Sequence, residues 1–194
     1  MNSISKRSLW VFSLLLNFSA CSVLPSRPPS PALHDFGLGG KASSDQAGEV
    51  PGTWSTVTVD APEWLQSENI RYRLLYSDPT RVRYYSQDRW IAPPPALLAQ
   101  RLGLDSVGQG FGLKIRLLEF EQVFDGPQQA RLMLAFRALA YRPGEEAASG
   151  EHLFRFTQPT PSADAQGAVT ATHGLVEQAT QSLQTWLAGL PARP

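Results

Sequence analysis

The C-terminal stretch from Asp164 to Leu190 limits the possible folds of this chain more than any other segment. Its apolar and small side chains recur at alternating spacings of three and four residues, which is the period of an amphipathic α-helix with one buried face. The members of this stripe are Val169, Thr172, Val176, Ala179, Leu183, Trp186 and Leu190. Gly189 and Pro191 are expected to end the helix. Such a helix needs an apolar surface to cover, so we expect the rest of the chain to supply a sheet.

Most of the preceding chain has the two-residue alternation that is typical of β-strands. Strands are predicted at residues 32–38, 53–60, 70–76, 81–86, 111–124, 130–141 and 151–157. The apolar phase shifts at Leu117 and Leu118, which predicts a β-bulge or a bend. A short helix is predicted from Ala96 to Leu104, after three prolines. This order predicts an α+β fold, a two-layer sandwich whose mostly antiparallel sheet is covered by a short helix and the long C-terminal helix.

The first twenty residues predict export from the cytoplasm. Lys6 and Arg7 form a basic start without acidic residues, Leu9–Leu16 is an apolar run, and small residues follow at Ser19 and Ala20. This order is typical of a secretory signal peptide. The apolar run is well short of the roughly 20 residues that a membrane-spanning helix requires. Residues 1–20 are therefore predicted to be removed as a signal peptide.

The only cysteine of the chain, Cys21, comes directly after this segment. The stretch Phe18-Ser19-Ala20-Cys21 resembles a bacterial lipobox, in which the cysteine is acylated and becomes the mature N-terminus. This predicts Cys21 as a lipid-attachment residue, because several acyl chains suffice for stable anchoring. The alternative is a plain secretory signal cut near Ala20, with Cys21 left as a free thiol. Ser22, in place of Asp, favours the outer membrane by resemblance to the sorting rules of enteric bacteria.

The residues after the cysteine divide the mature chain into a tether and one domain. Ser22–Pro31 contains four prolines and three serines, a composition that is typical of an extended linker. At about 3.1 Å per residue this linker would reach roughly 30 Å from the membrane surface. The predicted organisation is therefore a lipoprotein signal peptide at 1–20, a lipidated Pro/Ser-rich tether at 21–31 and a single domain at 32–194.

Composition excludes several classes of function. The chain has 17 basic and 17 acidic residues, and removal of Lys6 and Arg7 leaves 15 against 17, a net charge of −2. Such a balance argues against a nucleic-acid partner, because phosphate binding needs a surplus of cations. A single cysteine excludes an intrachain disulfide framework and a cysteine-cluster zinc site. No His-Glu-x-x-His, Gly-x-Ser-x-Gly or phosphate-binding glycine motif occurs, so we expect no enzyme, cofactor or metal site.

Two weaker patterns leave chemical alternatives open. His173 and Glu177 are four residues apart on one helix face, a spacing that suits either a metal or an ordinary surface pair. Glu119 and Glu121 alternate along one strand, as the paired carboxylates of a hydrolase or as part of a solvated strand face. An anchored hydrolase would need serine, histidine and acidic side chains to converge within hydrogen-bond distance.

The segment from Tyr72 to Trp90 is unusually rich in aromatic residues and arginine. One interpretation is a hairpin with its aromatic residues inward and its arginines outward. The other is a protein-binding surface, because tyrosine, tryptophan and arginine dominate interface hot spots. The candidate partner-binding residues are Tyr84, Tyr85, Arg89 and Trp90.

The same segment and its surroundings resemble the ABC-type transport auxiliary lipoprotein family, the group that includes PqiC. The resemblance covers about 160 residues from Cys21 onward. The motifs that carry it are His34-Asp35-Phe36-Gly37-Leu38, the strand from Val57 that ends in Pro62-Glu63-Trp64-Leu65, Ile70-Arg71-Tyr72-Arg73, Val82-Arg83-Tyr84-Tyr85, Arg89 to Pro94 leading into Leu97-Leu98, Leu118-Glu119-Phe120 and Phe124-Asp125-Gly126. The terminal helix also matches in place and length. Phe36 departs from the tyrosine usual in the family, and Ile91 lies between Trp90 and Ala92 as a further departure.

The resemblance implies a non-enzymatic lipoprotein on the periplasmic face of the outer membrane of a Gram-negative bacterium. Family members accompany an MCE-domain protein and an ABC permease and ATPase that move lipids between the inner and outer membranes. The implied role is to dock the periplasmic complex at the outer membrane, and assembly of several copies of the chain is an open alternative. A second hypothesis is a periplasmic lipid carrier with an apolar pocket between the terminal helix and the sheet.

Overall fold

The computed structural model describes residues 29–37, 53–106 and 110–191 of the chain. The predicted signal peptide at 1–20, Cys21 and most of the predicted tether lie outside the described residues. The elements, in chain order, are β1 (Ala32–His34), β2 (Trp54–Asp60), a single 3-10 turn η1 (Glu63–Leu65), β3 (Asn69–Leu74), β4 (Asp78–Trp90), α1 (Pro94–Gly103), β5 (Phe111–Gly126), β6 (Gln129–Tyr141), β7 (Gly150–Pro159) and α2 (Ala165–Ala188). Every strand and both helices predicted from the sequence are present, with β1 shorter and β4 longer than expected.

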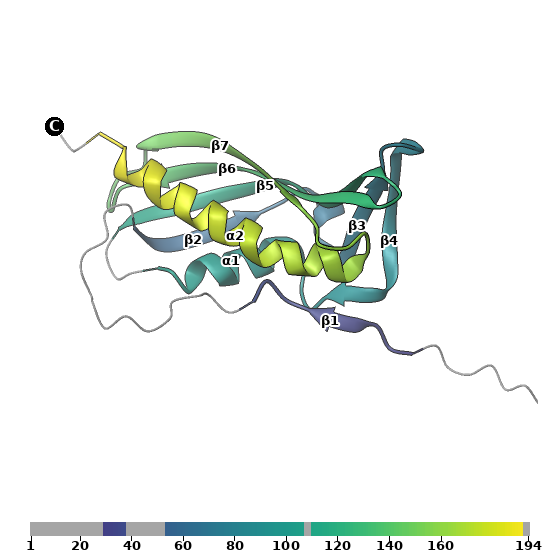
Figure 1. Cartoon of the computed structure of the whole chain (residues 1–194). Helices are drawn as coiled ribbons and strands as arrows, with labels where there is room; N and C mark the ends of the chain where they lie inside the picture. Colours follow the sequence, from purple (N-terminus) through teal and green to yellow (C-terminus); the bar gives the residue numbers. More distant parts are fainter. Residues whose placement is uncertain (1–28, 38–52, 107–109, 192–194) are drawn as a thin grey trace, which may run out of the picture.

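The strands form one sheet whose order is β1-β4-β3-β5-β6-β7, with β2 also paired to β5 (Figure 1). The β1–β4, β2–β5 and β3–β5 pairs are parallel, and the other three pairs are antiparallel. The predicted α+β fold is confirmed, but the prediction of a mostly antiparallel sheet is wrong because the sheet is mixed. Parallel neighbours such as β2 and β5 require a long connection, which here contains the β3–β4 hairpin and α1. The alternation of residues along a strand does not reveal whether its neighbour runs parallel or antiparallel to it.

β5 is the strand that organises the sheet. Along one edge its first half pairs with β2 and its last residues pair with β3, while β6 pairs along the whole of the other edge. The β5–β6 register shifts between Leu117 and Glu119, which confirms the bulge predicted from the apolar phase. The bulge keeps Leu117 and Phe120 both buried, although they are an odd number of residues apart. The bulge therefore keeps the apolar residues of β5 on its inner face on both sides of the register shift.

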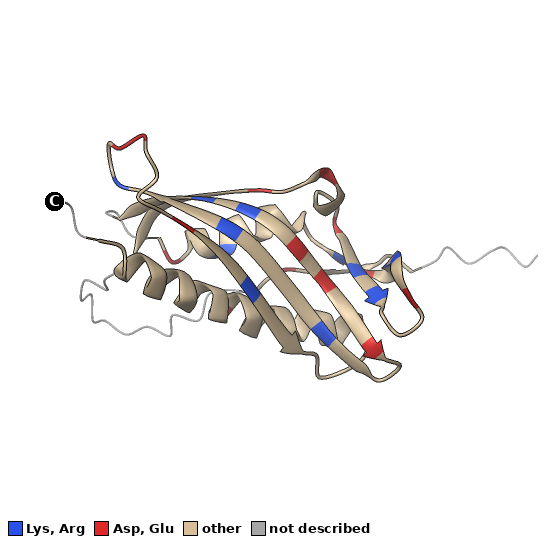
Figure 2. Cartoon of the chain, turned by 90° about the horizontal axis from the view of Figure 1, so that it is seen from above, with Lys and Arg blue, Asp and Glu red and all other residues tan. Residues whose placement is uncertain are grey.

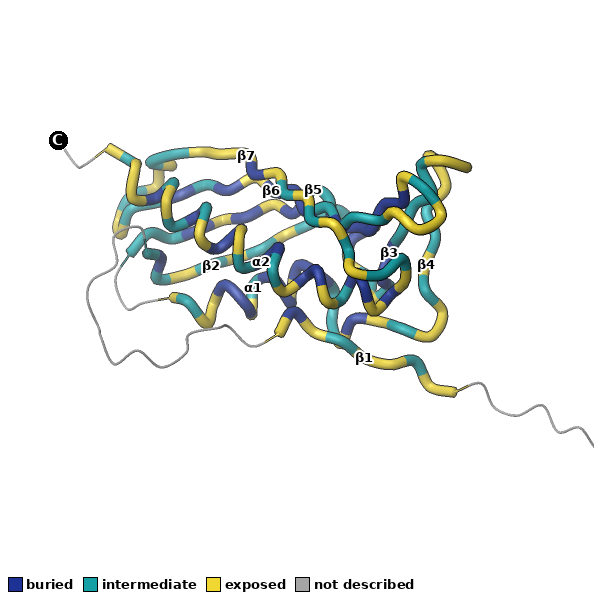
Figure 3. The backbone as a smooth tube through the Cα atoms, viewed as in Figure 1, coloured by how far each residue is buried: buried dark blue, intermediate teal, exposed yellow. Residues whose placement is uncertain are grey.

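The core lies between one face of the sheet and the two helices (Figures 1 and 3). Phe136 of β6 and Leu175, Val176 and Leu183 of α2 are fully buried there. Four members of the predicted stripe are buried, whereas Val169, Trp186 and Leu190 are only partly so. The buried face is completed by Ala165, Ala168, Ala171, Leu175 and Leu187. The alanines among these residues let the helix approach the sheet closely, which the apolar stripe alone did not indicate.

The packed core between α2 and the sheet argues against the lipid-carrier hypothesis. The side chains that a pocket between α2 and the sheet would expose pack against one another instead, as one cluster of buried residues. A hollow of about 510 Å³ does lie between α2 and the edge strand β7, lined by His152, Phe154 and Trp186 as well as by glutamine, serine and threonine side chains. This hollow is an open depression at the edge of the sheet, whereas a carrier would enclose most of its ligand in a pocket. Among the described residues, no helix is long and apolar enough to span a membrane.

Asp164 caps the N-terminus of α2. Its carboxylate accepts a hydrogen bond from the Ser162 hydroxyl at 2.6 Å and one from the Gly167 backbone N–H at 2.7 Å. The bond from Ser162, followed by that from Gly167, holds the pKa of the Asp164 carboxyl below its ordinary value. A side chain that satisfies a free N–H group at this position stabilises the helix.

We expect Asp164→Ala to lower the free energy of unfolding by about 1 kcal/mol at neutral pH. Because the pKa of Asp164 is lowered by folding, its contribution is complete above the ordinary carboxyl pKa and is lost as the pH falls through the lowered value. Urea unfolding of both chains should therefore show their difference shrinking in acid. Asp164→Asn is the matched control, since asparagine also caps helices but carries no titrating charge. A difference between wild type and Asp164→Ala that stays constant down to strong acid would contradict this role.

Candidate functional site

Trp90, at the end of β4, is a core residue. Its side chain is 1 % exposed, and its ring lies edge-on to Phe36 at 5.2 Å and tilted against Phe120 at 5.7 Å between centroids. The backbone there is held as well, because β1 pairs with the end of β4, with His34 opposite Trp90. Trp90 therefore does not present its ring to a partner, and its place among the candidate binding residues is corrected. Trp90 therefore fits the interpretation in which the aromatic residues of the hairpin face the core.

Tyr85 also faces the inner side of the hairpin. Its ring stacks on Tyr72 with 4.6 Å between centroids, and its hydroxyl donates to Oε1 of Gln122 at 2.6 Å. Gln122 is fully buried and in turn donates from Nε2 to the hydroxyl of Thr160. Burial, and then the nearby Tyr72 and Asp164, raise the pKa of the Tyr85 phenol. Tyr85 is thus half-buried and ties β4 to β5, and only part of its side chain is available to a partner.

The other two candidates, Tyr84 and Arg89, lie on the exposed surface. Tyr84 is 50 % exposed and is paired in register with Arg71 of β3, while Arg89 is paired with Asn69, two positions earlier on the same strand. Arg71 extends from β3 to donate to the backbone carbonyl of Trp64 at 2.8 Å. Arg71 therefore links the β3–β4 hairpin to Trp64, a residue that sequence reasoning did not nominate.

That residue, Trp64, is the most exposed large apolar side chain of the described chain, at 62 %. It lies in the three-residue turn η1, whose next residue, Leu65, is buried. Neighbouring positions on so short a turn point in different directions, so burial of Leu65 leaves Trp64 outward. The signal in the sequence was a tryptophan beside a leucine in a short turn, but only the structure shows which of the two is buried. We call Trp64, Tyr84 and Arg89 the hairpin surface, and the buried Arg71 links Trp64 to it.

A buried ion pair supports this surface from the sheet. Glu121 of β5 accepts a hydrogen bond from Nε of Arg73 at 2.7 Å, and its second oxygen is 3.7 Å from Nη2 of Arg71. The neighbouring Glu119 is instead 3.7 Å from Arg155 of β7. The two glutamates that suggested a hydrolase are therefore each neutralised by a different strand. They belong to a row of opposite charges across the open face of the sheet (Figure 2).

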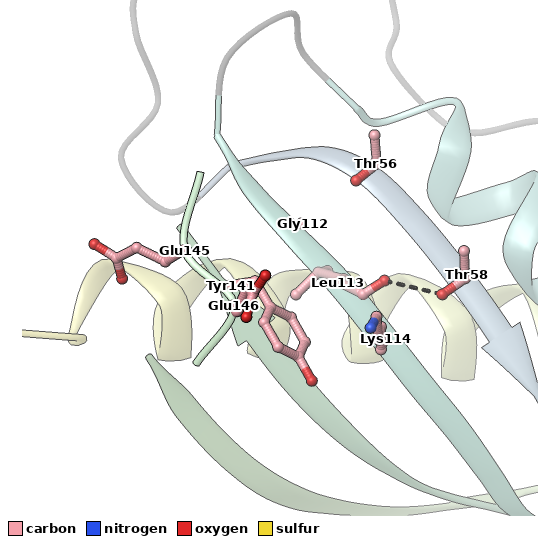
Figure 4. A pocket seen from close by; sticks show the side chains of 8 residues that line it. All are labelled: Thr56, Thr58, Gly112, Leu113, Lys114, Tyr141, Glu145 and Glu146. Atoms are coloured by element: carbon pink, nitrogen blue, oxygen red, sulfur yellow. Dashed lines mark hydrogen bonds between the residues drawn. The ribbon is translucent and has the colours of Figure 1, made fainter. Parts of the chain in front are cut away.

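The opposite end of this open face holds a hollow of about 440 Å³ (Figure 4). Thr56 and Thr58 of β2, Lys114 of β5 and Tyr141 of β6 contribute to its wall, together with Glu146 of the following turn. The Lys114 ammonium lies over the Tyr141 ring, 4.8 Å from its centroid, and the Thr58 hydroxyl donates to the Leu113 carbonyl. These contacts engage Lys114 and Thr58, and none of the residues lining the hollow is a histidine, serine or cysteine.

The structure gives His173 and Glu177 different neighbours. The Glu177 carboxylate accepts a hydrogen bond from the buried Arg101 of α1 at 2.8 Å, and Arg101 also pairs with Asp105. His173 instead lies next to Gly37, where an added Cβ would be 3.1 Å from its Nδ1. Within residues 29–37, 53–106 and 110–191 no three His, Cys, Asp or Glu residues are grouped as metal ligands. Glu177 thus joins the two helices through Arg101.

Two solved structures are similar in fold to this chain. No family model matches the sequence, and no curated protein does. Among solved structures, a Xanthomonas campestris protein of family DUF330 matches with a TM-score of 0.60 at 16 % identity, over 81 % of this chain and 91 % of that one. A second, uncharacterised protein matches with a TM-score of 0.60 at 12 % identity, over 82 % of this chain and 99 % of that one. The chain therefore has the α+β fold of a DUF330 protein.

Proposed function

We propose that this chain is an outer-membrane lipoprotein that docks a periplasmic MCE/ABC-type lipid-transport complex. The observation that carries the proposal is the likeness in fold to a DUF330 protein, because DUF330 denotes the PqiC family. The sequence motifs between His34 and Gly126 resemble the same family, and they support the proposal in addition to the fold. The partners are an MCE-domain protein and its ABC permease and ATPase, and the anchor is an acylated Cys21 on the periplasmic face.

The hairpin surface is the part of the domain that we assign to docking. It combines an exposed tryptophan, an exposed tyrosine and an exposed arginine, the residue types that carry most binding energy at protein interfaces. The buried Arg71 donates to the Trp64 carbonyl and pairs with Glu121, so the turn that carries Trp64 is fixed to the hairpin before a partner binds. A tether raises the local concentration of such a partner, so a weak contact suffices.

The test is capture of an MCE-domain protein from the same bacterium, using the Trp64→Ala, Tyr84→Ala double variant. We expect its dissociation constant to rise at least about tenfold, since each hot-spot truncation costs about 2 kcal/mol or more. The matched control is Leu104→Ala, which removes a similarly exposed apolar side chain (54 %) at the end of α1. Circular dichroism should show all variants folded, because none of these side chains is buried.

Two outcomes separate the surface from the function. Unchanged capture by the folded double variant would exclude the hairpin surface while leaving the docking role in place. Failure of the wild-type chain to capture the MCE protein, in membranes or in detergent, would contradict the docking role itself.

A further inference from the structure

Strand β7 forms a free edge of the sheet. It pairs with β6 over ten residues, from Gly150 to Pro159, and with no other strand of the described chain. Figure 1 shows it as the outermost strand above α2. Every second residue of such an edge has its backbone N–H and C=O groups directed away from the sheet, where another strand can pair with them. Residues along β7 are mostly exposed (Figure 3).

The edge is unusually suited to strand addition. Proteins commonly protect an edge with a very short strand, a bulge, an internal proline or charged side chains, and of these β7 has only the charges. β7 is long, its register with β6 has no shift, and its only proline is the last residue. On the open face of the sheet it carries Glu151, Leu153 and Arg155 in succession, and Leu153 is 40 % exposed between the two charges. An apolar residue flanked at equal distances by opposite charges is a self-complementary pattern.

We infer that β7 is the site at which a second copy of this chain adds to the sheet, antiparallel and with Leu153 on the two-fold axis. In this register Leu153 faces Leu153 of the second copy, Glu151 faces Arg155, and Arg155 faces Glu151. Opposite charges directly across an antiparallel pair stabilise it. The contact uses the same surface on both copies, so it closes as a dimer. Other registers lose this match, which makes the charge pattern specific for one alignment.

The pairing is compatible with the ion pairs that these residues already make. Glu151 lies 2.7 Å from Arg137, and Arg155 lies 3.7 Å from Glu119. Glu151, Arg137 and Arg155 are more than half exposed, and Glu119 is 38 % exposed. A carboxylate has several acceptor positions and a guanidinium has five donors, so each group can take a second partner. The dimer would extend the existing row of charges across both open faces.

The helix side of the edge is complementary as well. The hollow of about 510 Å³ between β7 and α2 has His152, Phe154 and Trp186 in its wall. In the same register Phe154 of the second copy faces His152, beside the Trp186 ring. His152 already packs against Phe154 and Trp186 within one chain, at 4.5 Å and 6.0 Å between ring centroids. The second strand would therefore add aromatic contacts to a cluster that exists before binding.

Cysteine cross-linking of the full chain, purified from the cells that express it, tests both the contact and its register. Directly opposed residues of an antiparallel pair are about 4.5–5.5 Å apart at Cα, within the range of a disulfide. Leu153→Cys should therefore form a covalent dimer on mild oxidation. Thr157→Cys, which is exposed on the same face and strand, is the matched control and should give at least about tenfold less dimer. The unmodified chain, with Cys21 as its only cysteine, should give none.

Reversal of the charges at Glu151 and Arg155 provides a second test of the contact between two β7 strands. Glu151→Arg or Arg155→Glu alone places two like-charge contacts across the axis and should weaken dimerisation, measured by light scattering, at least about tenfold. The double variant restores the intermolecular match while both intramolecular pairs stay broken, so recovery of the dimer would support the inference. A monomer in the double variant, equal dimer from Thr157→Cys, or a Leu153→Cys product of another mass would overturn it. The last outcome would identify a different protein as the occupant of this edge.

Discussion

Trp90→Ala is expected to destabilise the domain by about 3–5 kcal/mol, the usual cost of deleting a large buried aromatic side chain. The residue is fully enclosed, and its ring contacts Phe36, next to β1, and Phe120 of β5. Removing it would leave a cavity where three separate segments of the chain meet. Urea unfolding followed by circular dichroism should show a large decrease in the midpoint with the same slope.

The adjacent Arg89→Ala is the matched control for this prediction. Arg89 is exposed, so its replacement should change stability by less than about 0.5 kcal/mol. Loss of partner capture by Trp90→Ala would then follow from unfolding and would not identify a contact. If Trp90→Ala were instead as stable as wild type but failed to bind, Trp90 would be a surface residue and the described packing would be wrong.

Cys21→Ser is expected to abolish retention of the mature chain at the membrane. Each buried methylene of an acyl chain contributes about 0.8 kcal/mol, so two or more chains hold a protein almost permanently, and none leaves it free. The variant should be exported with a plain cleavable signal in place of residues 1–20, so that processing does not depend on the cysteine. Fractionation should then show a shift from the membrane to the soluble periplasmic fraction.

Mass spectrometry of the wild-type N-terminus separates the two interpretations of Cys21. An acylated cysteine at the start of the mature chain is the expected result. A free thiol on protein recovered in the soluble periplasm would establish the plain secretory alternative and remove the anchor from the proposed function.

Periodicity in the sequence was sufficient to predict the elements of the fold. Alternation located the strands and even the bulge after Leu117, and the spacing of Thr172 and Val176 located the helix face. These predictions succeeded because a strand or helix shows its buried face through the local order of its residues. Strand direction was predicted wrongly, because parallel and antiparallel neighbours bury the same alternating positions.

The candidate surface was harder to predict than the fold. Tyr84 and Arg89 proved exposed, whereas Trp90 proved buried and Trp64 was missed. A cluster of aromatic residues and arginine has the same composition whether it faces a partner or the core. Only the positions of Phe36 and Phe120, which come from strands far away in the sequence, decide that Trp90 lies inside.

The printed residues alone determined the two-layer class, the expectation of an N-terminal lipid anchor and the near-neutral charge, since each follows from local order or from counting. The three-dimensional structure alone decided the mixed sheet, the outward Trp64 and the free edge at β7, with opposite charges on either side of Leu153. The physical reason is that burial and strand pairing are relations between segments distant in the chain, and a local pattern shows which face is apolar but not what covers it.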